Sequence, residues 1–329
     1  VILGLGSKGG APLEQIPVIA VVGPTASGKT RLAVELALHY GGEVVSADSM
    51  QLYKGMAIGT AQPTPEEMRG VPHHLIAVRG PAVPCSVAEY VALAGACIAD
   101  IHARGRVPVV AGGTGLYADS LLLGRTFEET GRDDALRARL RQEADERGGE
   151  PLLARLAAFD PETAERLHPH NIGRIIRAIE VYETDGVTMS ELQRRSRLAP
   201  SPYRTFRIGL YAADRAALYA KIDARVDAMM AAGLLDEAKA LFAREDMRGG
   251  TAMQAIGYKE LAGYLRGECA LADAVEEIKR ATRRYAKRQM TWFRRAEGTL
   301  WIEIGMGNFE IICEQAIRGI DNARILCYN

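Results

Sequence analysis

Short apolar runs alternate with longer amphipathic segments along the first third of the chain. The apolar runs at 17–22, 43–47 and 107–113 have the length and β-branched composition of buried strands. The segments between them, at 31–40 and 86–105, instead carry apolar residues at helical spacing. Strands that alternate with helices in this way predict a parallel sheet with right-handed crossovers, and therefore an α/β fold.

The pattern changes in the middle of the chain. From about residue 127 the sequence reads as charged helices, and Asp160 followed by Pro161 is typical of a helix start. Prolines mark a boundary at 198–202, after which 206–210 and 301–305 indicate further strands. We therefore expect a P-loop parallel-sheet core with an inserted all-helical domain. The expected parts are a lead-in at 1–16, the first part of the core at 17–126, the insertion at 127–202, the return to the core at 203–305, and a tail at 306–329.

The first predicted strand runs directly into a phosphate-binding motif. Residues 23–30 read Gly-Pro-Thr-Ala-Ser-Gly-Lys-Thr, the spacing of the P-loop found in nucleotide-binding and ATP-binding proteins. In such a loop, backbone N–H groups surround phosphate oxygens, while Lys29 supplies a positive charge and Thr30 can reach a phosphate-bound Mg²⁺. A glycine-rich turn without a ligand is the alternative, but strand, loop and helix follow one another in the required order. We expect a diphosphate site, with Mg²⁺ as cofactor. Its residues are Gly23, Thr25, Ala26, Ser27, Gly28, Lys29 and Thr30.

An acidic residue stands at the end of another predicted strand. The strand at 107–111 runs into a glycine-rich segment, not into the aspartate expected of a P-loop hydrolase. The strand at 43–47 ends in Asp48. Ligands of parallel sheets bind at the carboxyl ends of the strands, so Asp48 should lie beside the P-loop. Composition alone leaves open whether this carboxylate holds a metal or acts as a base.

Composition limits the setting in which the protein works. The chain has 329 residues and a formal net charge of zero, and its 5 cysteines form no C-x-x-C pair. An odd cysteine count without such pairs favours a reduced, cytosolic environment. We find no basic-then-apolar leader and no apolar run of membrane-spanning length. The histidine pairs at 73–74 and 168–170 lack partner cysteines, which favours structural or surface roles over a metal site.

One segment near the end of the predicted core is strongly basic. Residues 279–295 contain lysines and arginines but no acid, and Arg284, Lys287 and Arg288 share one helical face. Aromatic residues are interleaved with these charges, as in proteins that bind nucleic acid. A solvated basic helix is the alternative. The absence of acids within the segment favours RNA binding through local phosphate contacts.

Several motifs occur in an order that is typical of a known family. They are GPTASGKT at 23–30, SADSMQLYKGM at 46–56, IGTA at 58–61, VPHHL at 71–75, GGTGLY at 112–117, IGYKE at 256–260 and KRQMTWFR at 287–294. Together they cover about residues 17–302 and resemble the motifs of the tRNA dimethylallyltransferases. Ala57 and Gln62 depart from the family pattern, which commonly has an acid and a lysine at these positions.

The resemblance implies an enzyme that transfers a dimethylallyl group from dimethylallyl diphosphate to tRNA. The acceptor would be N6 of the adenosine adjacent to the 3′ end of the anticodon, and diphosphate would be released. The site must then neutralise the diphosphate, hold N6 in line with the reacting carbon, and remove a proton. We expect Asp48 to be the general base, with a metal ligand or a helix N-cap as its alternative role.

Two further residues are expected to take part in catalysis. Thr25 can hydrogen-bond the amine or the diphosphate from within the P-loop. Arg225 matches a family arginine that faces the diphosphate. Because Asp223 and Asp227 flank it within helical reach, a surface ion pair is the alternative for Arg225.

The resemblance also implies a set of tRNA contacts. The target base must leave its stack to reach a buried diphosphate. The amides of Gln51 and Gln254 can read base edges, and the arginines of the insertion suit the phosphates of the anticodon stem-loop. The expected contact residues are Asp48, Ser49, Met50, Gln51, Thr114, Arg137, Gly173, Arg174, Ile175, Ile176, Arg177, Gln254, Gly257, Tyr258, Lys259, Lys287, Arg288, Gln289, Trp292 and Arg294.

Two other classes of protein remain as alternatives. A P-loop kinase of a small molecule or nucleotide would use residues 23–30 and Asp48 but would leave the basic segment at 279–295 unexplained. An RNA-binding P-loop ATPase or adaptor would bind RNA without transfer chemistry. The favoured interpretation has tRNA and dimethylallyl diphosphate as partners. It describes a cytoplasmic protein that does not bind a membrane and acts as a monomer.

Overall fold

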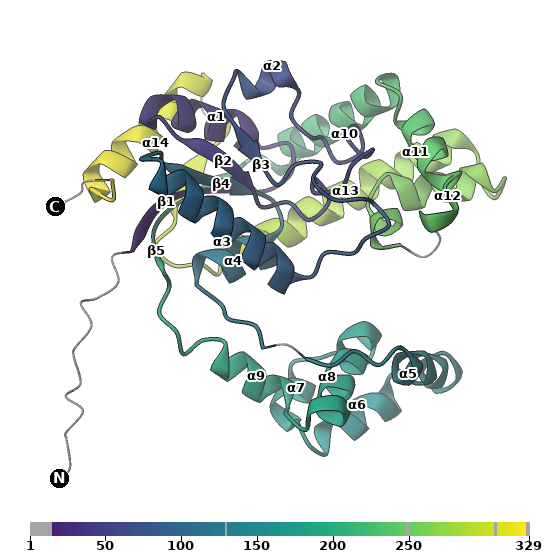
Figure 1. The fold of residues 1–329 in the computed structure, drawn as a ribbon. Coiled ribbons are helices and arrows are strands. Elements are labelled where there is room, and N and C mark those ends of the chain that lie inside the picture. The colour runs from purple at the N-terminus through teal and green to yellow at the C-terminus, as the bar shows by residue number, and fades with distance from the viewer. Residues whose placement is uncertain (1–14, 129, 248–249, 306–307, 327–329) are drawn as a thin grey trace, which may run out of the picture. The chain divides into compact units, whose positions relative to one another are not determined.

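The chain divides into two compact units. A computed structural model of the protein describes residues 15–128, 130–247, 250–305 and 308–326 (Figure 1). The core unit comprises 1–123 and 202–329, and the helical unit comprises 124–201. The predicted lead-in at 1–16 lies almost entirely outside the described residues.

A parallel sheet forms the centre of the core unit. Its 6 strands follow the order β3-β2-β4-β1-β5-β6, and each neighbouring pair is parallel. This arrangement confirms the predicted α/β class. The strands are β1 (Ile16–Val22), β2 (Glu43–Ser46), β3 (His73–His74), β4 (Pro108–Gly112), β5 (Tyr203–Tyr211) and β6 (Leu300–Glu303).

Helices cover both faces of this sheet. Because side chains alternate along a strand, Val18, Ala20 and Val22 of β1 lie in one hydrophobic cluster and Ile19 and Val21 in another. The first cluster packs against α3 and α4, and the second against α1 and α14. These helices are α1 (Lys29–Tyr40), α3 (Val87–Ala103), α4 (Gly115–Leu122) and α14 (Phe309–Ala323). Burial on both faces explains why the strands read as continuous apolar runs.

The tail at 306–329 had no predicted structure. Its described part forms α14, which buries Ile312, Ala316 and Ile320 against the sheet. These residues recur at helical spacing, so the pattern for α14 is present in the sequence.

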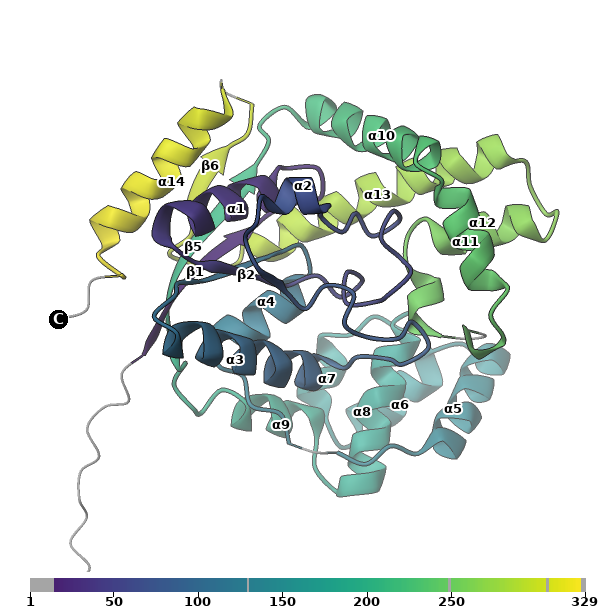
Figure 2. The same cartoon turned by 45° about the horizontal axis from the view of Figure 1, so that its top comes forward.

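A second group of helices extends the core unit beyond the sheet. They are α2 (Pro65–Met68), α10 (Arg215–Ala231), α11 (Leu234–Phe242), α12 (Tyr258–Leu265) and α13 (Leu271–Phe293), with short 3₁₀ turns at Glu245–Met247 and Thr251–Gln254. Helices α10 and α13 run side by side, as Figure 2 shows. Tyr53 and Met56, from the loop after β2, pack into the same cluster as α11 and α12. This packing holds that loop against the second group of helices.

The helical unit has a hydrophobic core of its own. Its helices are α5 (Asp134–Arg147), α6 (Glu150–Ala157), α7 (Pro161–Glu165), α8 (Ile172–Asp185) and α9 (Met189–Arg195). As the sequence predicted, Asp160 caps α7, with Pro161 in its first turn. The Asp160 carboxylate also accepts a bond from the Ser190 N–H, which ties α7 to α9. Within the described ranges of both units, none of the helices has the length and apolar composition needed to span a membrane.

Candidate active site

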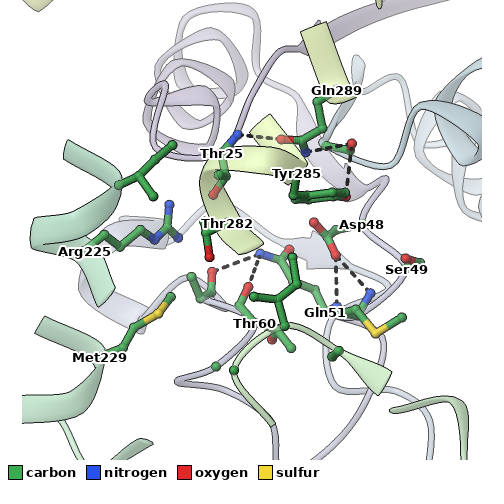
Figure 3. A pocket seen from close by; sticks show the side chains of 18 of the residues that line it. Thr25, Asp48, Ser49, Gln51, Thr60, Arg225, Met229, Thr282, Tyr285 and Gln289 are labelled. Atoms are coloured by element: carbon green, nitrogen blue, oxygen red, sulfur yellow. Dashed lines mark hydrogen bonds between the residues drawn. The ribbon is translucent and has the colours of Figure 1, made fainter. Parts of the chain in front are cut away.

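A cavity of about 340 Å³ lies at the carboxyl ends of β1, β2 and β4 (Figure 3). All of its walls belong to the core unit. The P-loop, the segment 48–51 after β2 and the glycines after β4 line one side, and α10, α13 and residues 254–259 line the other. The sheet thus brings together the P-loop, Asp48 and the Gly112–Gly113 segment, as the strand-end argument predicted.

Residues 23–30, the predicted P-loop, have a backbone conformation that favours glycine at positions 23 and 28. Ala26 and Gly28 have positive φ angles of 61° and 83°. A Cβ at Gly23 would stand only 2.7 Å from the Leu210 carbonyl oxygen of β5. The Ser27 hydroxyl is buried and has no hydrogen-bond partner among the residues that the structure describes. A buried hydroxyl of this kind normally has an ordered water or a ligand as its partner.

Four cationic residues line the cavity, Lys29, Arg225, Lys259 and Arg288, and the first two interact electrostatically with Asp48. Burial lowers the pKa of Lys29 to about 7; the nearby Arg225 adds to the decrease and Asp48 opposes it. Burial also lowers the pKa of Arg225, against the attraction of Glu67 and Asp48. The Lys29 Nζ donates a hydrogen bond of 2.6 Å to the Pro24 carbonyl, but neither Lys29 nor Arg225 forms an ion pair in the described part of the chain. An anion in this cavity would therefore approach two cationic groups, Lys29 and Arg225, that have no ion-pair partner among the described residues, although Asp48 acts on both from a greater distance.

The structure tests the alternative that Arg225 forms a surface ion pair. Asp223 accepts hydrogen bonds from Arg283, and Asp227 lies 2.8 Å from the Lys279 Nζ. Both acids that flank Arg225 in sequence are thus paired with α13. The alternative of a surface ion pair for Arg225 is therefore wrong, and Figure 3 shows its guanidinium directed into the cavity.

Asp48 presents one fixed oxygen and one accessible oxygen. Its Oδ1 accepts a hydrogen bond of 2.9 Å from the Met50 N–H and a longer one of 3.4 Å from the Gln51 N–H. Its Oδ2 lies on the side of Tyr285 and Gly113, where a Cβ built on Gly113 would be 3.9 Å away (Figure 3). The turn thus fixes the carboxylate while it leaves an oxygen for a proton or a metal. These bonds close a turn and no helix begins at Asp48, so the alternative of a helix N-cap is wrong.

The segment after Asp48 is held by its own side chains. The Gln51 Nε2 donates to the carbonyls of Thr60 and Ala61, and its Oε1 accepts from the Ser46 hydroxyl. These bonds occupy the amide that we expected to read a base edge. The Gln62 Nε2 donates to the carbonyls of Gln51 and Tyr53. A neutral amide thereby supports the loop at the position where the family pattern has a lysine.

A carboxylate that the sequence analysis missed holds the next turn of this loop. Glu237 of α11 accepts hydrogen bonds from the N–H groups of Ile58 and Gly59 and from the Tyr258 hydroxyl, at 2.6–2.9 Å. Tyr258 is therefore fully buried and contacts protein instead of solvent. Glu237 lies far from this loop in sequence, so no local pattern indicates the contact.

One face of α13 is polar and packs into the protein. Gln289 is only 4% exposed, and the Trp292 Nε1 donates a bond of 2.6 Å to Asp119, which pairs with Arg207 of β5. Thr282 and Tyr285 lie on the same face and line the cavity. Gln289 and Trp292 were expected to contact tRNA, but here their polar groups bind protein atoms. The spacing 282, 285, 289 and 292 is helical, so a polar inward face was readable in the sequence.

The basic residues of α13 carry less uncompensated charge than expected. Arg284 pairs with Glu277, Lys279 with Asp227, and Arg283 with Asp223. The assumption that acids do not compensate this run is therefore wrong. Lys287, Arg288 and Arg294 are exposed and form no ion pair within the described ranges, and Arg288 lies 5.6 Å from the ring centre of Tyr285.

The helical unit uses two of its predicted tRNA-contact arginines internally. Arg137 and Arg177 both pair with Glu180, whose side chain is fully buried. Ile175 and Ile176 belong to the hydrophobic core of the unit. Among the contact residues expected on α8, only Gly173 and Arg174 are exposed. Other residues expected to contact tRNA lie in the core unit. The Thr114 hydroxyl accepts a bond from the Ser49 N–H, and Gln254, Gly257 and Lys259 line the cavity.

The histidine pair at 73–74 forms β3, at the edge of the sheet. The His74 Nε2 lies 2.7 Å from Glu43, a carboxylate that Arg104 also binds. The described residues contain no group of three or more His, Cys, Asp or Glu side chains arranged to hold a metal ion.

Sequence comparison relates most of the chain to one group of proteins. A family model described as IPP transferase matches residues 51–296, and one described as isopentenyl transferase matches 16–80. A tRNA dimethylallyltransferase of Geobacillus kaustophilus is 49% identical over 92% of this chain and 95% of its own length. One of Symbiobacterium thermophilum is 51% identical over 88% of this chain and 90% of its own length.

Solved structures give the same relationship. A tRNA isopentenylpyrophosphate transferase of Bacillus halodurans superposes with a TM-score of 0.71 and 41% identity, covering 94% of this chain and 96% of that one. A eukaryotic dimethylallyltransferase acting on tRNA superposes with a TM-score of 0.80 and 28% identity, covering 94% of this chain and 79% of that one.

Proposed function

The chain belongs to the tRNA dimethylallyltransferase family, and we propose that it takes its prenyl group from dimethylallyl diphosphate bound at residues 23–30. It is a transferase that prenylates tRNA. We propose N6 of the adenosine beside the 3′ end of the anticodon as the acceptor. The observation that carries the proposal is the pair of cations, Lys29 and Arg225, that face the cavity beside Asp48 without an ion pair in the described chain.

The leaving group determines what the P-loop must supply. Breaking the allylic C–O bond leaves a stabilised carbocation and a diphosphate on which negative charge grows. The loop N–H groups, the Lys29 ammonium and the Arg225 guanidinium can stabilise that charge as it develops. Ile222, Val226 and Met229 of α10 line the cavity with apolar groups, which suit the hydrocarbon part of the donor.

Asp48 supports the second half of the reaction. The lone pair of adenine N6 is delocalised into the ring, so the amine is a weak nucleophile until it loses a proton. The accessible Oδ2 of Asp48 can accept that proton, while the bonds from Met50 and Gln51 to Oδ1 fix the direction of the carboxylate. Thr25 lines the same cavity and can hydrogen-bond the amine or the diphosphate.

The donor set in the cavity fits a Mg²⁺ ion that arrives with the diphosphate. Mg²⁺ usually keeps several waters and binds substrate phosphates through few protein ligands. Thr30 lines the cavity and offers a hydroxyl of this kind, and the orphaned Ser27 hydroxyl lies in the same loop. Bound there, the ion would neutralise charge on the leaving diphosphate.

The tRNA must deliver its base to the rim of this cavity. We propose that the adenine leaves its stack and enters between the 48–51 segment and α13. Lys287 and Arg294 on the outer face of α13, and Arg288 at the edge of the cavity, are exposed and suited to phosphate contacts. Arg174 and Gly173 of the helical unit are proposed as further contacts. We also propose that the enzyme works in the cytoplasm as a monomer, which light scattering of the purified protein would test.

Mass spectrometry of tRNA tests the proposal directly. The protein is incubated with tRNA, Mg²⁺ and dimethylallyl diphosphate, and parallel samples contain ATP in place of the donor or lack Mg²⁺. We expect one prenyl group per modified tRNA, at the adenosine beside the anticodon, only when donor and Mg²⁺ are both present. Phosphate transfer from ATP with no prenyl gain would instead support the kinase alternative, which the comparisons do not favour. ATP turnover stimulated by RNA, again without prenyl gain, would support the adaptor alternative.

A further inference from the structure

Gln289 is a buried amide on an otherwise basic stretch of helix. It lies between Arg288 and Met290 on α13, yet its side chain points into the protein and is only 4% exposed. A buried amide is unfavourable unless its polar atoms find partners. Gln289 finds both partners in the loops that form the cavity.

The two hydrogen bonds of Gln289 join loops that are far apart in sequence. Its Oε1 accepts a bond of 2.8 Å from the Thr25 N–H of the P-loop, and its Nε2 donates one of 2.8 Å to the Gly113 carbonyl after β4 (Figure 3). The Thr25 amide is therefore turned toward α13 instead of toward a phosphate. The adjoining Thr114 hydroxyl accepts a bond from the Ser49 N–H, next to Asp48. One continuous chain of contacts thus runs from the diphosphate loop to the carboxylate.

Gln289 packs closely against Gly113. A Cβ at Gly113 would stand 2.2 Å from the Gln289 Nε2, so a glycine at 113 and a glutamine at 289 fit each other. Lys287 is exposed on the outer face of α13, away from this inward contact, whereas the exposed Arg288 lies at the edge of the cavity near Tyr285.

We infer that Gln289 is a positioning residue for prenyl transfer, which sets the P-loop and the Asp48 side of the cavity at the separation that the reaction needs. This inference rests on the proposed function. The reacting carbon is held on the P-loop side and the acceptor amine on the Asp48 side. Loss of the two Gln289 hydrogen bonds would therefore misplace one reactant relative to the other. A misplacement of about 1 Å can lower the rate of such a reaction by about 10²-fold.

Two substitutions test the inference in the full-length protein. Gln289→Met keeps the length of the side chain but removes both hydrogen bonds. Gln289→Glu keeps the acceptor for the Thr25 N–H and donates to Gly113 only when its carboxyl is protonated. The matched control is Tyr40→Phe, which removes a side-chain hydrogen bond to Asp321 at the far end of α1. The measurements are kcat, KM for dimethylallyl diphosphate, the Kd for tRNA, and the melting temperature.

We expect Gln289→Met to lower kcat/KM for the donor by about 10²-fold, with tRNA affinity unchanged and the protein folded at the assay temperature. Gln289→Glu should recover activity relative to wild type as the pH is lowered, because a neutral carboxyl can donate to the Gly113 carbonyl. Tyr40→Phe should keep wild-type kinetics, even if its melting temperature falls by as much as that of Gln289→Met.

Three results would overturn the inference. One is wild-type kcat/KM in Gln289→Met. Another is a loss of tRNA affinity as large as the loss of turnover, which would make Gln289 a tRNA contact. The third is a Gln289→Glu variant whose activity relative to wild type does not depend on pH. Failure of the wild-type protein to prenylate tRNA at all would instead refute the proposed function, so the two failures are distinguishable.

Discussion

Two regions of this chain, the ion-pair network around Glu180 and the cavity of the core unit, treat charged side chains in opposite ways. In the helical unit, Glu180 is fully buried and receives Arg137, Arg177 and the Asp133 N–H. In the core unit, Lys29 and Arg225 line a cavity, and neither forms an ion pair with a described residue. Breaking a buried pair is strongly destabilising, whereas an unpaired charge in a cavity is suited to a ligand of opposite sign. The first arrangement thus maintains a fold, and the second prepares a binding site.

The pKa values of Glu180 and Lys29 show a second difference between the two regions. Burial alone would raise the pKa of Glu180, but hydrogen bonds from Arg137, the Asp133 N–H and Arg177 outweigh it and lower the pKa to about 2. The partners of Glu180 therefore keep its charge, whereas burial of Lys29 lowers its pKa to about 7 and weakens its charge until an anion arrives.

The largest expected effect is on the chemistry of the cavity. Asp48→Asn removes the proton acceptor but keeps the shape of the side chain and an oxygen for the bonds from Met50 and Gln51. Turnover should fall by about 10²–10⁴-fold, while diphosphate and tRNA affinities and the melting temperature stay close to wild type. Single-turnover kinetics with saturating substrates provides the measurement. Near-normal turnover would show that Asp48 is not the base.

The next effect concerns the paired charges of the helical unit. Glu180→Ala leaves Arg137 and Arg177 without their shared carboxylate. Because their side chains are 36% and 34% exposed, the cost should lie below the value of about 3–5 kcal/mol for a fully buried pair. We expect a lower melting temperature for the transition of this unit and unchanged diphosphate affinity in the core unit. Differential scanning calorimetry, with diphosphate titrations below the transition, measures both. Weakened diphosphate binding together with unchanged stability would contradict the structural assignment of Glu180.

A smaller effect concerns protons at Lys29. Because its pKa in the free protein is about 7 and an anion favours the ammonium form, inorganic diphosphate should bind with proton uptake by Lys29 above pH 7. Affinity should therefore fall as the pH rises through 7. Calorimetric titrations in buffers of different ionisation enthalpy measure the uptake, and Lys29→Met separates it from the protons of diphosphate itself. Equal uptake by variant and wild type would assign the protons elsewhere.

The smallest effect is expected at the exposed basic residues of α13. The single variants Lys287→Gln and Arg288→Gln should each have a smaller slope of log tRNA affinity against log salt. The expected decrease is about 0.7–0.9 for each phosphate that the variant no longer neutralises. Arg284→Gln is the matched control, because Arg284 already pairs with Glu277 and should change the slope less. Equal slopes for all three variants and the wild type would make these residues part of a solvated surface. The tRNA would then have to bind mainly through other residues.

Local patterns were enough to predict much of this molecule. The run at 17–22, the P-loop and the helix after it were predictable because strand length, glycine spacing and helical periodicity are all properties of neighbouring residues. The same holds for Asp48 at a strand end and for the cap at Asp160. The strand β3 was missed because two residues are too few to show an alternating pattern.

The missed features depend on partners that are distant in sequence. The segment 279–295 contains no acid, but α10 supplies Asp223 and Asp227 to it across the helix pair. Trp292 looked like an aromatic anchor for RNA because nothing near it in sequence indicates Asp119 on α4. The sequence likewise contains no sign that the Gln51 amide has protein partners, but in the fold it donates hydrogen bonds to the carbonyls of Thr60 and Ala61. Tertiary contacts decide which polar groups are available, and a single sequence does not show them.

The central claim is that unpaired cations mark the diphosphate site, and Arg225→Gln tests it most directly. Inorganic diphosphate affinity and the melting temperature of the ligand-free protein are measured on the same sample. We expect affinity to fall by about 10–100-fold, the loss of one or two hydrogen bonds to a charged group. The melting temperature should rise, because a partly buried charge without an ion pair is removed. A lower melting temperature with unchanged diphosphate affinity would contradict the account, because Arg225 would then maintain the fold as Arg137 does.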